Sequence, residues 1–299
     1  MHSYSSGDWE ISKEYDDDLI NRNLKTIDII APSYILYHFY TKMERGCYAD
    51  AKDLADKLSD IGNVYEHEYS IVSKYFANAP FLKKYRKLRE ALIEVNKGIN
   101  FTNKTAFTLF LFALYSTKAR IQMMMGDIQE AENTLQYANE IKSEIFPPPF
   151  LLRHFLRSHF AIDLYQLEQS IKTGNASDIA KNKMNALKAA KKAVKNSRKV
   201  VFDQIETYKL MGVYFWLINK QKKALKWWSR SISEGERLEG RELSRTYFEV
   251  GKRLLQSNSK HKELNNITAE EYLEKARTLF KEMDLQWDLD ELDKVMAER

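Results

Sequence analysis

Basic side chains make the densest group with a clear chemistry in this 299-residue sequence. No acid lies between Asp178 and Asp203, and the basic residues between them are Lys181, Lys183, Lys188, Lys191, Lys192, Lys195, Arg198 and Lys199. Clustered cations attract phosphate and carboxylate groups, although no aromatic residue interleaves these lysines as in a typical single-strand nucleic-acid site. Two interpretations stay open: a solvated helix face, or a site for nucleic acid or an acidic membrane surface. The residues expected on the buried face of this helix are Ala180, Met184, Leu187 and Val194.

Side chains that could catalyse a reaction or hold a metal are scattered. His154 and His159 are five residues apart, which on a helix places them on different faces, unlike an i, i+4 ligand pair. Glu66, His67 and Glu68 are consecutive, and helix neighbours splay by about 100° each, so these side chains cannot converge. The glycines stand singly and form no phosphate-binding loop. The sequence therefore predicts no catalytic residue, no metal site and no cofactor, and we expect the protein not to be an enzyme.

Helical hairpins are the elements that must position these side chains. Apolar residues recur at intervals of three and four between most of the breaks in the sequence, as on amphipathic helices. In the clearest hairpin, over residues 208–232, Gly212 and Ala224 are twelve residues apart on either side of a turn at 219–221. Two small residues so placed allow the backbones of the two helices to approach closely.

Less regular copies of this pattern fill the rest of the chain. Their contact and turn residues are Ala119 and Ala131 around a turn at 125–127, Gly251 and Ala269 around a polar loop at 257–268, Gly46 with Cys47, and Gly174 with Asn175. Asp127 is expected to cap the helix that follows it. The interval of 80 residues between Gly46 and Gly126 indicates a hidden hairpin. We place it at 61–98, with a break at 78–80, because a proline interrupts helical hydrogen bonding.

This pattern resembles the tetratricopeptide repeat (TPR). Its period is nearer 40 residues than the roughly 34 of the standard repeat. The ending at 272–280 is similar to long-helix variants in the sensor halves of bacterial signalling ATPases, adenylyl cyclases and transcription activators. The resemblance implies an all-α, right-handed superhelix of about six stacked hairpins, a TPR-like α-solenoid with a C-terminal capping helix. It also implies a protein-binding scaffold that serves as a regulatory or sensor part of a signalling system.

We therefore predict a single repeat array over residues 1–299. One hairpin cannot bury both of its apolar faces, whereas stacked hairpins bury a continuous core. The predicted parts are a partial repeat at 1–26, hairpins at 27–60, 61–98, 104–145, 148–197, 201–238 and 240–283, and a capping helix at 286–299. Because the partial repeat begins in the middle of the pattern, the chain is expected to be a piece of a longer protein.

The implied architecture places the first helix of each hairpin on a concave surface. The side chains expected to contact a partner in this groove are Arg120, Met123, Lys172, Lys209, Trp216, Arg245, Phe248 and Lys252. Its charged members are all basic, so the expected partner is an acidic peptide or another protein. Lys209 and Lys252 are the expected electrostatic anchors, with Trp216 as the apolar anchor between them. The alternative is that acids of other helices neutralise these cations.

The composition fits a folded chain, with 44% hydrophobic and 30% charged residues and a net charge of +5. That mild charge does not by itself indicate nucleic acid. No apolar run reaches the roughly 18 residues of a membrane helix, and residues 1–9 lack the pattern of a signal peptide. Cys47 is the single cysteine, which is typical of a reducing compartment. We expect a cytoplasmic protein that binds another protein or an acidic peptide; nucleic acid and membrane are disfavoured, and the oligomeric state is undetermined.

Overall fold

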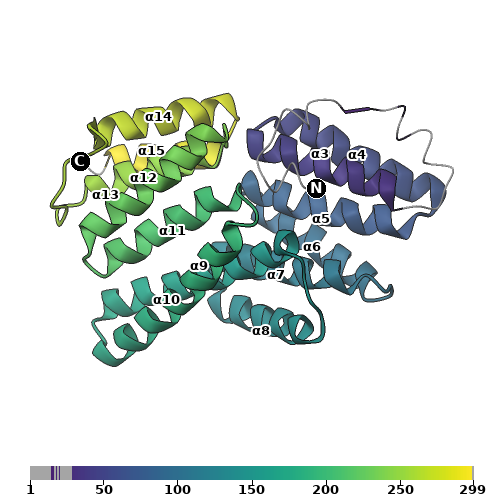
Figure 1. The fold of residues 1–299 in the computed structure, drawn as a ribbon, viewed down its shortest axis with the longest axis horizontal. Helices are drawn as coiled ribbons and strands as arrows, with labels where there is room; N and C mark the ends of the chain where they lie inside the picture. The colour runs from purple at the N-terminus through teal and green to yellow at the C-terminus, as the bar shows by residue number, and fades with distance from the viewer. Residues whose placement is uncertain (1–14, 17, 19, 21–28, 298–299) are drawn as a thin grey trace. The chain divides into compact units, whose positions relative to one another are not determined.

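The computed structural model describes residues 15, 16, 18, 20 and 29–297. These residues form an all-α fold with one short β-hairpin, which confirms the predicted fold class (Figure 1). The signal-peptide region at 1–9 and most of the partial repeat predicted at 1–26 lie outside the described residues. The chain divides into two compact units, residues 1–158 and 159–299. No helix in the described part of the chain is both long and apolar enough to cross a membrane.

The first unit is built from consecutive helical hairpins, coloured purple to teal in Figure 1. Its helices are α3 (Ile30–Arg45), α4 (Tyr48–Tyr65), α5 (Glu68–Lys84), α6 (Leu88–Thr102), α7 (Thr108–Met125) and α8 (Ile128–Glu144), and α9 (Pro149–Thr173) begins here and continues into the second unit. From α3 to α8, each helix packs against the next. The first helices of successive hairpins, α3, α5 and α7, also contact one another.

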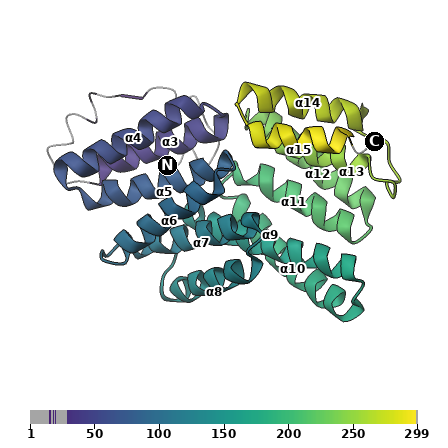
Figure 2. The same cartoon turned by 180° about the vertical axis from the view of Figure 1, so that it is seen from behind.

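The second unit repeats this arrangement, and Figure 2 shows it from behind. Its further elements are α10 (Ala176–Ser197), α11 (Asp203–Leu217), α12 (Gln221–Arg237), α13 (Leu243–Leu254), β1 (Glu263–Leu264), β2 (Ile267–Thr268), α14 (Ala269–Glu282) and α15 (Gln286–Ala297). From α10 to α15 each helix packs against the next, and α11 also contacts α13. Sequential packing of hairpins is thus confirmed within each unit. The single array over 1–299 and its right-handed superhelix stay predictions.

Turn residues end several helices where the sequence predicts them. Gly46 (φ 77°) and Gly126 (φ 91°) take the left-handed backbone after α3 and α7, a conformation that glycine adopts without steric cost. The predicted cap at Asp127 is wrong: its backbone (φ −81°, ψ 65°) is not extended, and its side chain accepts no cap hydrogen bond. Asn175 does cap α10, because its Oδ1 accepts two backbone N–H groups at 3.1 and 3.3 Å.

The predicted break at 78–80 is wrong, because α5 runs through Pro80 and ends at Lys84. Proline has no N–H to donate to the carbonyl four residues earlier, which here belongs to Phe76. The hydroxyl of Tyr40 on α3 donates to that carbonyl oxygen instead, at 3.0 Å. Burial raises the pKa of Tyr40, so the hydroxyl keeps the proton that it donates. A tyrosine on a neighbouring helix thus replaces the donor that proline lacks.

Gly212 on α11 and Trp228 on α12 make the close contact of the clearest hairpin. A Cβ added at Gly212 would lie 2.1 Å from Trp228 Nε1. The Trp228 indole is fully buried, and its Nε1 donates to the backbone carbonyl of Lys209 at 3.1 Å. The predicted contact of Gly212 with the second helix of the hairpin is therefore confirmed, but the atoms nearest the glycine belong to the indole of Trp228 and not to Ala224.

The polar loop predicted at 257–268 contains the β-hairpin. Its strands pair antiparallel, with Leu264 opposite Ile267. Asn265 and Asn266 at the tip have φ values of 54° and 59°, which asparagine tolerates in a two-residue hairpin turn. The Tyr272 hydroxyl on α14 donates to the backbone carbonyl of Leu264 at 2.9 Å and so fixes the hairpin on its helix.

We predict that Tyr40→Phe lowers the free energy of unfolding by about 1–3 kcal/mol, because it leaves the buried Phe76 carbonyl without a donor. Tyr75→Phe on α5 is the matched control and should cost less than about 0.5 kcal/mol. In a Pro80→Ala background the restored backbone N–H can reach the same carbonyl, so Tyr40→Phe should cost less there. Chemical denaturation of the parent, the two single variants and the double variant measures the coupling energy between positions 40 and 80. Additive effects would contradict the role of the Tyr40 hydroxyl as the replacement donor.

Gly212→Ala should destabilise the protein by about 1–3 kcal/mol, the usual cost of overpacking a core. Trp228 cannot give way without losing its hydrogen bond to the Lys209 carbonyl. Val213→Ala, at the next, partly exposed position of α11, controls for a change of side-chain size and should cost less. An unchanged denaturation midpoint for Gly212→Ala would show that this contact is absent in solution.

Candidate binding surfaces of the second unit

The basic residues of 181–199, here called the lysine face, lie on the exposed part of α10 and, for Arg198 and Lys199, in the turn that follows it. All eight are exposed, and none of them has an ion-pair partner among the residues that the structure describes. Successive helix residues turn by about 100°, so Lys188, Lys191 and Lys195 lie within about 60° of one another around the axis. With a rise of about 1.5 Å per residue, the helical part of the face extends for about 21 Å from Lys181 to Lys195.

The buried side of α10 differs from the predicted one. Met184 is 66% exposed, Ala180 is exposed, and Leu187 and Val194 are half-buried. The residues that are buried instead are Ala186, Ala189, Ala190, Ala193, Asn196 and Ser197. These small side chains let α10 lie close to its neighbours, and the larger apolar residues are left nearer the surface. Met184 consequently stands within the lysine face, one turn from Lys188.

Two hydrogen bonds hold α10 in place. Asn182 Nδ2 donates to the backbone carbonyl of Gln166 on α9 at 3.3 Å. The Tyr214 hydroxyl on α11 donates to the backbone carbonyl of Lys183, also at 3.3 Å. The lysine face is therefore presented on a helix that its neighbours fix on two sides.

Two cations predicted to face the groove are used inside the fold. Lys209 Nζ lies 2.6 Å from Glu242 Oε1, and Arg245 Nη1 lies 3.4 Å from Glu242 Oε2. Arg245 also binds both carboxylate oxygens of Asp288 on α15, at 3.0 and 2.7 Å. The four side chains are between 3% and 13% exposed. This buried ion chain neutralises Lys209 and Arg245, so little of their charge is available to an external acidic ligand.

Arg253 is another cation with internal partners. Its side chain is 10% exposed, and its guanidinium lies 2.7 Å from Glu249 and 3.6 Å from Glu168. Burial alone would raise the pKa of the Glu249 carboxyl, but the Arg253 guanidinium lowers it below its usual value. These buried cations thus have carboxylate partners, in contrast to the cations of the lysine face.

Trp216 is buried, which corrects the expectation that it points into an open groove. Its side chain is 5% exposed, and its Nε1 donates to Gln256 Oε1 at 2.8 Å. Its ring centroid lies 5.4 Å from that of Trp228. The indole is therefore part of the core between α11, α12 and the segment after α13.

The remaining predicted groove residues are distributed over both units. Arg120 and Met123 belong to α7 of the first unit, where Arg120 Nη1 lies 3.9 Å from Met123 Sδ. Lys172 is exposed near the end of α9. Lys252 is exposed on α13, with its Nζ 6.0 Å from the Phe248 ring centroid. Their contact with a partner stays a prediction.

The sequence patterns did not predict a pocket that the structure contains in the second unit. Its lining residues are Asn219, Lys220, Gln221, Lys222, Lys223, Lys260 and His261. The sequence pattern predicted only a hairpin turn at 219–221. The one indication of a binding site in the sequence was a group of three lysines near this turn with no acid among them. Lys260 and His261 come from the loop after α13, whose path no periodic pattern indicates.

Comparisons with known proteins assign no family to the chain. No protein-family model matches its sequence, and no curated protein matches it. The proposals for its function therefore rest on the surfaces described above.

Asp288→Ala is predicted to lower the free energy of unfolding by about 3–5 kcal/mol, because it breaks a buried ion pair and leaves Arg245 without its bidentate partner. Asp293 on the same helix is the matched control: it pairs with Arg277 at 3.0 Å but is 62% exposed. Asp293→Ala should cost less than about 1 kcal/mol. Equal losses in urea denaturation would mean that the ion chain is solvated.

Proposed function

We propose that this protein is a non-catalytic binding module that holds an acidic segment of another protein on the lysine face of α10. The observation that supports this proposal is the set of eight exposed cations without a carboxylate partner among the described residues. Like charges one turn apart destabilise a helix, so the fold tolerates a cost at this face. An acidic partner would offset that cost and would be attracted from a distance.

Met184 favours a protein partner over a nucleic acid or a membrane. Its exposed side chain offers an adaptable apolar contact among the lysines. Seven of the eight cations are lysine rather than arginine. Arginine is the residue that makes bidentate contacts with phosphate, so this composition is less typical of a nucleic-acid site. The small, apolar side of α10 is packed inside the fold, so the helix has no large apolar face to place in a lipid surface. The fitting partner carries acidic side chains around one apolar residue.

A regulatory or sensor role in a signalling system is the biological setting that we propose for this binding. It is supported by the resemblance of the hairpin spacing to the tetratricopeptide repeats in the sensor halves of signalling proteins. The same proposal includes neither catalysis nor a cofactor, because the sequence contains no phosphate-binding glycine loop and its histidines are not spaced as metal ligands.

Photo-cross-linking tests the proposal directly. A photoreactive benzoylphenylalanine replaces Lys191 on the lysine face, and in the matched control it replaces Lys226, an exposed lysine on α12. Each purified protein is irradiated in a lysate of the source cells, which is then treated with nuclease. We expect a protein adduct at position 191 that survives the nuclease and is absent at position 226. Adducts that nuclease removes, or adducts of equal yield at both positions, would contradict the proposal.

Kinetics with the captured partner then test the charges. The triple variant of the face is Lys188→Gln, Lys192→Gln and Lys195→Gln, and the control with the same net charge is Lys226→Gln, Lys262→Gln and Lys281→Gln. Loss of electrostatic steering should slow association of the first variant about tenfold or more at low salt and flatten its salt dependence. The control should associate like the parent. Similar rates for both variants would place the binding site elsewhere.

A further inference from the structure

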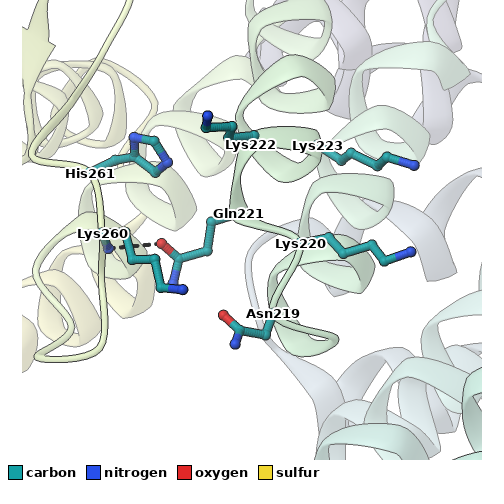
Figure 3. Close-up of a pocket in the computed structure, with 7 residues that line it drawn as sticks. All are labelled: Asn219, Lys220, Gln221, Lys222, Lys223, Lys260 and His261. Atoms are coloured by element: carbon teal, nitrogen blue, oxygen red, sulfur yellow. Dashed lines mark hydrogen bonds between the residues drawn. The ribbon is translucent and has the colours of Figure 1, made fainter.

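The pocket at the start of α12 brings basic residues of two segments together. Four lysines and His261 line it together with Asn219 and Gln221, no carboxylate lines it, and its volume is about 470 Å³. Figure 3 shows Lys222, Lys260 and His261 on one side of the start of α12, whereas Lys220 and Lys223 extend away from them toward the other side. The pocket thus has cations on both of its walls, Lys222 at the start of α12 and Lys260 in the loop after α13.

Gln221 fixes the two walls of this pocket to each other. Its side chain is buried, with 5% exposed, and its Nε2 donates to the backbone carbonyl of Asn258 at 2.9 Å. Its Oε1 accepts the backbone N–H of Lys260 at 2.8 Å, the dashed line in Figure 3. One side chain therefore ties the turn between α11 and α12 to the loop after α13, so the spacing of the walls is set before a ligand arrives.

The charges around this pocket oppose the local preferences of the helix. The first turn of α12 contains no acid, although the partial positive charge of a helix N-terminus favours acids and disfavours lysines. Lys220, Lys222 and Lys223 are exposed, and no described residue forms an ion pair with them or with Lys260. A multiply charged anion in the pocket would offset the repulsion between these lysines and the helix N-terminus. Residues that oppose the local preference of a helix are expected where a protein has a function.

We propose that this pocket binds the diphosphate group of a small molecule. Each lysine ammonium donates up to three hydrogen bonds and accepts none, so the lining suits an anion rich in oxygen. Two linked phosphates place anionic oxygens at both ends and can engage Lys222 on one wall and Lys260 on the other. The volume lies within the usual range of small-molecule sites. The pocket shares no residue with the lysine face, so this proposal does not depend on the proposed function.

Isothermal titration calorimetry with inorganic pyrophosphate tests the site on the full chain. The variant is Lys222→Gln/Lys260→Gln, which removes one cation from each wall. The control with equal net charge is Lys226→Gln/Lys281→Gln, two exposed lysines outside the pocket. Loss of charge-assisted contacts should weaken pyrophosphate binding by about tenfold or more in the variant and by less than about twofold in the control. Gln221→Leu, which unties the two walls, should weaken binding as well.

Further titrations identify the ligand. Inorganic phosphate should bind the parent more weakly than pyrophosphate, because it is smaller, carries fewer anionic oxygens and engages only one wall of the pocket. A nucleoside diphosphate that competes with pyrophosphate would assign the diphosphate to a nucleotide, and failure to compete would leave inorganic diphosphate as the ligand. The proposal is overturned if pyrophosphate does not bind the parent, if both lysine variants lose the same affinity, or if phosphate binds as tightly as pyrophosphate.

Discussion

Pairing of buried charge is the constraint that organises the second unit. Lys209, Glu242, Arg245 and Asp288 alternate in sign and are almost completely removed from water, so each needs its neighbours to offset its desolvation. This buried ion chain joins α11, α13 and α15, and its contacts hold α15 against the end of the second unit. It also takes two cations away from the predicted groove. The exposed cations on α10 and around the start of α12 have no carboxylate partner among the described residues, and they form the two clusters that we propose as anion sites.

Much of the fold could be predicted from the sequence, because hairpin packing depends on local spacing. The spacing around Gly212 predicted that α11 packs on α12, although the residue against the glycine is Trp228 and not the predicted Ala224. Gly46 and Gly126 marked turns that only glycine adopts easily. The break at Pro80 was mispredicted because the lost backbone hydrogen bond is replaced from a distant part of the sequence. The Tyr40 hydroxyl, on another hairpin, donates to the carbonyl that proline leaves without a donor. No spacing rule within α5 contains that information.

The binding surfaces were less predictable, since a side chain's availability depends on partners far along the chain. Lys209 and Lys188 look alike in the sequence, yet Glu242 neutralises the first from 33 residues away and nothing described neutralises the second. Trp216 was expected at the surface because it lies off the main packing face, but Gln256 and Trp228 cover it. The buried side of α10 was misplaced because alanines, which weigh little in a hydrophobic pattern, pack more closely than methionine or leucine.

The division of cations between the interior and the surface is the central claim, and the reactivity of lysine amines measures it directly. Brief labelling of the native protein with an amine-reactive reagent, followed by peptide mass spectrometry, gives a rate for each lysine. Lys188, Lys192 and Lys195 should react quickly, and Lys209 should react much more slowly because its ammonium is buried against Glu242. Labelling of Lys209 at the rate of Lys188 would contradict the claim, since its charge would then be open to a ligand.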